Sequence, residues 1–125
     1  MLQTQTFKEI KPNKAIVVRG NERKKITIPN NPVQYHEITP SGAKSMAMFS
    51  AIATPGQSTG TRDLRHSGDE VLLVLSGHFQ IDFDDHQEKL GPGDSVFIPR
   101  GIKHRVTNIG ELTAEAVFVL SPPEY

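Results

Sequence analysis

A chain of 125 residues with no net charge is long enough for one domain around a single core. Its 36% hydrophobic and 22% charged residues exclude an extended disordered protein, and the absence of cysteine excludes a disulfide framework and a thiolate metal site. No apolar run approaches the length of about 18 residues that a membrane span needs, and the N-terminal residues lack the apolar stretch of a signal peptide. We therefore expect a cytoplasmic protein with no membrane partner.

The charges are unevenly distributed along the chain. Residues 1–44 contain eight Lys and Arg against three Asp and Glu, whereas residues 45–125 contain six against eleven. The only dense basic cluster, Arg23, Lys24 and Lys25, has no interleaved aromatic residues, so we interpret it as a solvated loop and expect no nucleic-acid partner. The opposite charges also suggest that the two parts lie against each other, within one chain or between two copies, and we expect a homodimer.

The pattern of short apolar runs predicts an all-β fold. Nine prolines and ten glycines separate runs rich in Val, Ile, Phe and Thr, as in a β-sandwich or barrel, and no segment has a convincing helical pattern. We predict strands over residues 15–19, 25–28, 33–38, 45–54, 70–76, 78–84, 95–98, 104–108 and 115–120. Residues 84–87 and 91–94 are predicted turns.

Two of these strands show clear side-chain alternation. In residues 78–84 every second residue is apolar, which indicates one buried and one solvated face. Residues 45–53 are uncharged on both faces, which indicates a strand covered on both sides. Residues 1–44 are richer in proline. We predict one domain overall, with residues 1–44 as an arm of short strands that packs on a barrel formed by residues 45–125.

Three side chains form a candidate metal site. His66 and Glu70 are four residues apart, so they share a face of a strand, although the same spacing also shares a face of a helix. Gly68 and the apolar run after Glu70 favour the strand, and Gly68 leaves space between the two side chains. His104 follows a second turn. Two imidazoles and one carboxylate are the facial set that leaves coordination positions open, although the spacing alone also fits a surface histidine and a solvated glutamate.

A resemblance strengthens this interpretation. The pattern Gly93-x5-Pro99-x-Gly101-x2-His104-x3-Asn108 resembles the second motif of the cupin superfamily, and the pairs Gly60-x5-His66 and Glu70-x6-Gly77 resemble the two ends of its first motif. The resemblance implies a cupin barrel, also called a double-stranded β-helix or jelly roll. It also implies that the metal ligands are His66, Glu70 and His104. The chain departs from most cupins at Gly68, where they have a second histidine.

The variant motif narrows the resemblance to two kinds of cupin. The sequence His-x-Gly-Asp-Glu is similar to the sensor domains of helix-turn-helix cupin regulators and to a non-haem iron epoxidase with a His-x3-Glu pair and a later His. Iron(II) is the best fit to two imidazoles and one carboxylate, and zinc, nickel and manganese remain open. Residues 1–44 are too short and too rich in proline for a DNA-reading domain.

Four further residues are candidates for substrate binding. Arg62 shares the parity of His66 and would hold an anionic group from inside the barrel, although it also fits an exposed arginine on the preceding loop. The apolar residues Met48, Phe83 and Phe118 are core residues that also suit the wall of a pocket. We interpret His36, His78 and His86 as surface residues, although His36, beside Tyr35, also fits the barrel mouth. Asp94 and Asn108 are interpreted as turn and backbone-binding residues.

Three functions fit these features. The first is a small enzyme that uses a mononuclear iron(II)-type centre on a small polar or anionic molecule bound to the metal, as an oxidoreductase, isomerase or lyase. The second is a non-catalytic module that binds or senses a small molecule. The third is a structural barrel with an empty site, which an intact ligand set disfavours. We favour the enzyme.

Overall fold

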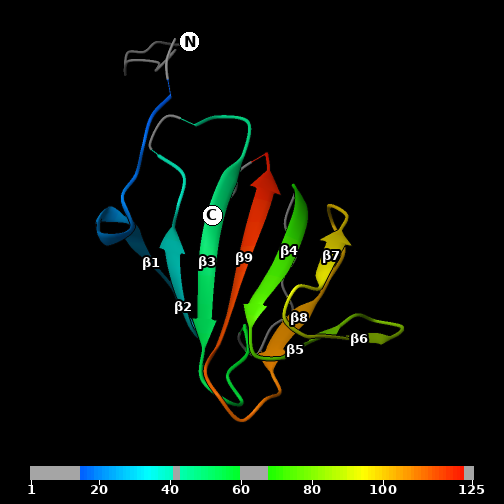
Figure 1. Cartoon of the computed structure of the whole chain (residues 1–125). Coiled ribbons are helices and arrows are strands. Elements are labelled where there is room, and N and C mark those ends of the chain that lie inside the picture. The colour runs from blue at the N-terminus through cyan, green and yellow to red at the C-terminus, as the bar shows by residue number, and fades with distance from the viewer. Residues whose placement is uncertain (1–14, 41–42, 60–67, 123–125) are drawn as a thin grey trace.

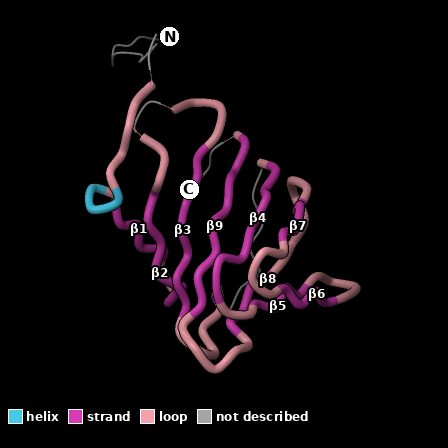
Figure 2. Tube along the Cα trace, in the orientation of Figure 1, coloured by secondary structure: helices cyan, strands magenta, loops and turns pink. Residues whose placement is uncertain are grey.

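The computed structural model describes residues 15–40, 43–59 and 68–122, and it confirms the all-β prediction (Figure 1). Its strands are β1 (Lys24–Ile28), β2 (Asn31–Glu37), β3 (Ala47–Ala53), β4 (Asp69–Ser76), β5 (Phe79–Asp82), β6 (Gln87–Leu90), β7 (Ser95–Ile98), β8 (Arg105–Asn108) and β9 (Ala114–Ser121). The one helical element in these described ranges is a 3-10 turn, η1 (Gly20–Glu22) (Figure 2). None of their helices is long and apolar enough to cross a membrane.

The strands form two antiparallel sheets. The larger sheet has the order β1-β2-β3-β9-β4-β7, and the smaller has the order β6-β5-β8. The last strand, β9, lies between β3 and β4 and pairs with both along most of its length. Strands that are distant in sequence therefore close the larger sheet, and β5 pairs in the same way with the distant β8. Strands β1 and β2, from the part predicted as an arm, continue the sheet of β3.

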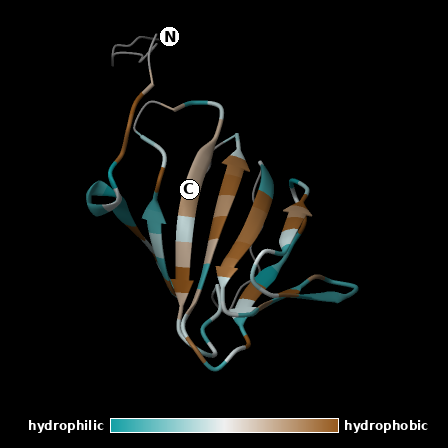
Figure 3. Cartoon of the chain, viewed as in Figure 1, coloured by the Kyte–Doolittle hydropathy of each residue, from teal (hydrophilic) through white to brown (hydrophobic). Residues whose placement is uncertain are grey.

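Alternation along the strands places the core between the two sheets. In β4, every second residue from Glu70 to Val74 is buried, and the residues between them are exposed. The side chains of Ile81 in β5 and Ile98 in β7 are fully buried, and each such burial contributes about 1.5–3 kcal/mol. Apolar residues are concentrated in β9, β4 and β7 (Figure 3).

Particular residues form the turns between strands. Asn30 joins β1 to β2 with a φ of 62°, a left-handed conformation that asparagine tolerates. Asp94 accepts a hydrogen bond from the Gly91 amide at 2.8 Å. The Asn108 amide donates to the carbonyls of Ala53 and Leu112, both at 2.9 Å. The structure thus confirms the roles predicted for Asp94 and Asn108.

Two predictions of local structure were wrong. Residues 15–19 form no strand, and Ile16 and Val17 are exposed, because an apolar run without a neighbouring strand gains no burial. Strand β6 begins at Gln87, which was predicted to be part of a turn. Its mostly polar sequence fits an edge strand that, among the described strands, pairs only with β5 and remains largely exposed.

Candidate metal centre in the barrel cavity

Glu70 lies on the inward face near the start of β4. Glu70 is 5% exposed, and it lies opposite Ile98 of β7 and Leu120 of β9 in the sheet register. Gly68, two residues earlier, is buried against the end of β9: an added Cβ would lie 2.5 Å from the Pro122 carbonyl oxygen. The missing side chain at Gly68 is therefore required by this close approach of the C-terminal segment, which is a different reason from the one predicted.

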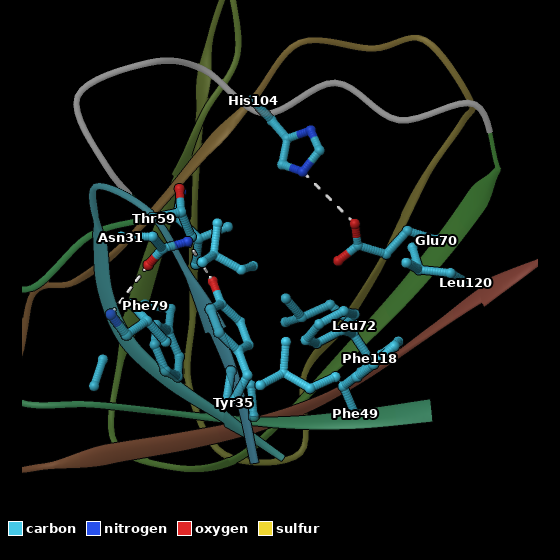
Figure 4. Close-up of a pocket in the computed structure, with 17 residues that line it drawn as sticks. Asn31, Tyr35, Phe49, Thr59, Glu70, Leu72, Phe79, His104, Phe118 and Leu120 are labelled. Carbon is cyan, nitrogen blue, oxygen red and sulfur yellow. Dashed lines mark hydrogen bonds and ion pairs between the residues drawn. The ribbon is translucent and has the colours of Figure 1, made fainter. Parts of the chain in front are cut away.

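His104 reaches the same space from the other sheet. It directly precedes β8 and follows the turn at Pro99–Gly101, where Gly101 has a φ of 79°. Its Nδ1 lies 2.8 Å from the Ile102 carbonyl oxygen, which can only accept a hydrogen bond, so Nδ1 carries the proton. The other ring nitrogen, Nε2, faces Glu70 with 3.6 Å between Nε2 and Oε1 (Figure 4).

The geometry of this pair fits a shared metal ion. The side chains of His104 and Glu70 are 1% and 7% exposed, and 3.6 Å is longer than a hydrogen bond. Two ligands at about 2.1 Å from one ion lie about 3.0 Å apart at a right angle and about 3.4 Å apart at the tetrahedral angle, close to this separation. A hydrogen bond that fixes Nδ1 and presents Nε2 is also the usual support of a metal-binding histidine.

The third predicted ligand, His66, lies outside the described residues. Within the part of the chain that the structure describes, no group of three or more His, Cys, Asp or Glu could hold a metal ion. The structure thus brings together Glu70 and His104, and the complete three-residue site stays a prediction.

An exposed contact between Asp69 and Arg100, called the tie below, links the segments that carry Glu70 and His104. The Arg100 amide, in the turn before His104, donates to Asp69 Oδ1 at 3.0 Å, and the guanidinium Nε lies 3.5 Å from the same oxygen. The backbone hydrogen bond, followed by the side-chain one, lowers the pKa of Asp69 below its ordinary value. Because Asp69 directly precedes Glu70, this contact joins the His104 turn to the strand that carries Glu70.

The pair borders a cavity of about 280 Å³ between the sheets. Most of its 17 lining residues are aliphatic or aromatic. The polar ones are Glu70, His104, Thr59, Asn31 and Tyr35. Such a space suits one small organic ligand that meets polar groups at a few points.

The predicted substrate-binding residues occupy different places. Phe118 lines the cavity, with its ring stacked on Phe49 at a centroid distance of 5.1 Å. Met48 does not line it: it lies on the opposite face of β3, because Phe49 and Ala51 are the residues that point inward. Phe83 lies next to the cavity lining, 6.4 Å from the His104 ring. Arg62 lies outside the described residues.

His86 belongs to a separate, exposed cluster. Its Nδ1 lies 2.7 Å from Asp85, its Nε2 lies 3.3 Å from Glu88, and its side chain is half exposed. The hydrogen bond with Asp85 is the main cause that raises the pKa of His86. The His86 ring also stacks on Phe83, with centroids 4.8 Å apart. This surface environment separates His86 from the histidine in the cavity.

Tyr35 and Asn31 are two polar cavity residues that sequence reasoning did not assign to the site. Both lie on β2, within the segment predicted as a peripheral arm. The sequence did contain a signal: Val33 and Tyr35 alternate with polar residues, which indicates a strand with one face in the core.

Comparisons with known proteins agree with this architecture. The family described as "Cupin domain" matches residues 50–120, which contain both Glu70 and His104. The chain is 30% identical to the protein SchB of Streptomyces halstedii over 116 residues, which are 93% of this chain and 75% of SchB. It is also 30% identical to the polyketide synthase CurC of Streptomyces cyaneus over 115 residues, or 92% of this chain and 66% of CurC.

A solved structure shows the same fold. The polyketide cyclase RemF of Streptomyces resistomycificus superposes with a TM-score of 0.72, covering 88% of this chain and 81% of RemF at 20% identity. At this identity the likeness concerns the fold alone.

Proposed function

Because this chain belongs to the cupin family, we propose that it is a metal-binding enzyme whose cavity takes a mostly apolar, oxygen-bearing molecule of the polyketide type. The observation that carries the proposal is the buried pair of Glu70 and His104 at the edge of a mainly apolar cavity. The relatives named as a polyketide synthase and a polyketide cyclase support this substrate class.

The cavity lining favours this substrate over the small polar or anionic molecule predicted from the sequence. Among the described residues no lysine or arginine lines the cavity, whereas Phe49, Phe79 and Phe118 offer aromatic surfaces to a flat carbon framework. An extended ketone chain or its cyclised aromatic product presents such a framework with oxygen atoms at its edge. The apolar walls would exclude water from the reacting carbon atoms.

Glu70 and His104 would hold a divalent ion, with His66 as the proposed third ligand. A bound ion supplies Lewis-acid polarisation of a carbonyl or enolate oxygen. The Ile102 carbonyl keeps the proton on Nδ1 of His104, so that Nε2 would be the nitrogen that binds the ion. We propose iron(II) first, with zinc, nickel and manganese compared in the same experiment.

Metal content tests the site directly. We expect the purified chain to retain about one divalent ion, measured by mass spectrometry of the metal. Single substitutions His66→Ala, Glu70→Ala and His104→Ala should each weaken metal binding by at least about tenfold, because each removes a ligand. His86→Ala is the matched control and should leave metal binding unchanged. Loss of metal in His86→Ala with retention in His104→Ala would contradict the site.

Turnover separates the enzyme from a binding module. We expect the metal-loaded chain to convert a synthetic linear poly-β-ketone into one cyclised phenol, and chromatography measures the products. His104→Ala should lose the selectivity for this one product. A non-catalytic sensor would bind the compound and return it unchanged, which would contradict the enzyme proposal while leaving the metal site intact.

We further propose that two copies pair through the outer face of the larger sheet. The outward-facing residues Val71, Leu73 and Leu75 of β4 and Phe97 of β7 are 36% to 58% exposed, and Phe97 lies opposite Val71 in the register. A second copy would cover this face by two-fold pairing of the same patch. Light scattering during gel filtration should give a dimer that Leu75→Lys with Phe97→Lys converts to a monomer. Leu112→Lys, at a residue 77% exposed elsewhere, is the control.

A further inference from the structure

Tyr35 places a hydroxyl group inside the cavity. The residue lies on β2, is 5% exposed, and directs its hydroxyl into the space bordered by Glu70 and His104 (Figure 4). The Asn31 amide nitrogen donates to this hydroxyl oxygen at 2.9 Å. Because Asn31 Oδ1 accepts from the Val33 amide at 3.0 Å, the orientation of the Asn31 side chain is fixed. In this arrangement the Tyr35 oxygen is an acceptor, and no residue that the structure describes accepts the Tyr35 hydroxyl proton.

The Tyr35 hydroxyl can donate its proton to a further acceptor. A phenol can both donate and accept, and the bond with Asn31 is the hydrogen bond that Tyr35 makes within the described ranges. Buried donors in proteins normally find a partner in the chain, in water or in a ligand. A ligand oxygen in the cavity would complete the set for Tyr35.

The environment keeps Tyr35 a donor at neutral pH. Burial raises its pKa to about 12; the Asn31 hydrogen bond opposes this, and the nearby Glu70 carboxylate adds to it. In the metal-free chain the group therefore remains a protonated phenol at neutral pH and does not act as a base.

Aromatic packing holds the Tyr35 ring in place. Tyr35 meets Phe118 edge to face at a centroid distance of 6.0 Å, and Phe118 stacks on Phe49. These rings come from three adjacent strands, β2, β9 and β3. The donor is therefore positioned by rigid sheet residues, as recognition of one particular oxygen requires.

We propose that the Tyr35 hydroxyl, held by Asn31, donates a hydrogen bond to a carbonyl or phenol oxygen of the ligand in the cavity. The ligand class is an apolar carbon framework with two separated oxygen functions, one at Tyr35 and one at the Glu70–His104 pair. The position of the second oxygen rests on the proposed function; the role of Tyr35 does not.

A matched pair of probes tests the hydrogen bond in the metal-free chain. The bicyclic ketone 1-tetralone and the hydrocarbon tetralin share a carbon skeleton and differ at the ketone oxygen. By titration calorimetry, we expect the wild type to bind 1-tetralone about fivefold to tenfold more tightly than tetralin. Tyr35→Phe should bind the two within about twofold of each other, with tetralin affinity unchanged, because only the hydroxyl is lost. Tyr125→Phe removes the other tyrosine and should keep the wild-type preference.

The outcomes separate this inference from the proposed function. A wild-type preference for the ketone that persists in Tyr35→Phe would overturn the inference, and so would a wild type that binds neither probe or binds both equally. Metal content is measured on the same variants, and Tyr35→Phe should retain it. If the chain binds no metal but prefers the ketone in a way that depends on Tyr35, only the metal site is contradicted. If it binds metal but shows no Tyr35-dependent preference, only the role of Tyr35 is contradicted.

Discussion

The two polar pairs in the cavity are held in different ways. Asn31 and Tyr35 lie on a single strand and are joined by a 2.9 Å hydrogen bond, whose donor is fixed in turn by the Val33 amide. Glu70 and His104 come from different sheets, and their nearest oxygen and nitrogen are 3.6 Å apart. The first pair is organised by its own hydrogen bond, whereas the second has the spacing of two groups that share a third partner. The comparison predicts that a metal ion acts on Glu70 and His104 and not on Asn31 and Tyr35.

The largest expected effect is on stability at high pH, through Tyr35. Its pKa of about 12 in the folded chain exceeds the ordinary value of 10.0, so the stabilisation is fully present below pH 10 and is lost as the pH rises through 12. The two-unit difference corresponds to about 3 kcal/mol. Urea denaturation between pH 9 and pH 12 should show this loss in the wild type, and Tyr35→Phe should lack it.

Absorbance can assign this titration, because the chain has two tyrosines and no tryptophan. In Tyr125→Phe, we expect the tyrosinate band to appear near pH 12 and not near pH 10. Glu70→Gln should lower the pKa of Tyr35, because the carboxylate charge helps to raise it. A single titration near pH 10 in Tyr125→Phe would contradict the buried position of Tyr35.

The next effect should appear only at the other pair. At a free metal concentration about 100 times the dissociation constant, binding to the folded chain adds about 2.7 kcal/mol, or about 10 °C in melting temperature. Calorimetric melting of the wild type with iron(II) or zinc, before and after EDTA, measures this shift. Tyr35→Phe should keep the shift and His104→Ala should lose it. Equal shifts in both variants would show that the metal binds elsewhere.

A smaller effect concerns the bond within the first pair. Asn31→Ala removes the donor to Tyr35 and should lower the free energy of unfolding by about 1 kcal/mol. Combined with Tyr35→Phe in a double-mutant cycle, the two changes should be less than additive, since either one breaks the same bond. Additive losses would mean that the two side chains do not interact in solution. Asn30→Ala is no suitable control, because Asn30 has a positive φ, so Thr27→Ala on the neighbouring β1 is preferable.

The same two pairs show what could be predicted from the sequence. Glu70 and His104 were identified because each lies in a short sequence pattern that resembles a cupin motif, and the structure faces them toward each other. Tyr35 and Asn31 were missed because their strand was interpreted as part of an arm, and only its pairing with β3 makes it a cavity wall. Whether a strand joins a sheet depends on contacts with residues distant in sequence, which a local pattern does not contain.

The same limit of local patterns applies to which face of a strand is buried. The alternation in β5 predicted its buried residues, Phe79 and Ile81, because polar residues marked the other face. In β3 neither face is charged, so the sequence did not distinguish Met48 from Phe49 as the cavity residue. Strand β6 has no apolar alternation and forms by pairing with β5 alone.

The smallest expected effect is on metal affinity, through the exposed contact between Asp69 and Arg100. Asp69→Ala removes the acceptor of the Arg100 amide, so the turn before His104 loses one contact with the strand that carries Glu70, whereas the pairing of β7 with that strand remains. We expect metal affinity to fall by less than about tenfold, because the three proposed ligands remain and the Asp69–Arg100 contact is partly solvated. Asp69→Asn retains a carbonyl acceptor and should recover most of the affinity. Asp85→Ala removes a more exposed carboxylate, beside His86, and is the control.

The pH dependence of this tie has the opposite sign to that of Tyr35. Because Arg100 lowers the pKa of Asp69, the tie is intact above the ordinary carboxyl pKa and is lost as the pH falls through the lowered value.

Ketone preference at Tyr35 should be the same in Asp69→Ala and the wild type, since the tie holds only the Glu70–His104 pair. If Asp69→Ala changed ketone preference as strongly as metal affinity, the two pairs would be coupled through the barrel and the distinction between them would fail.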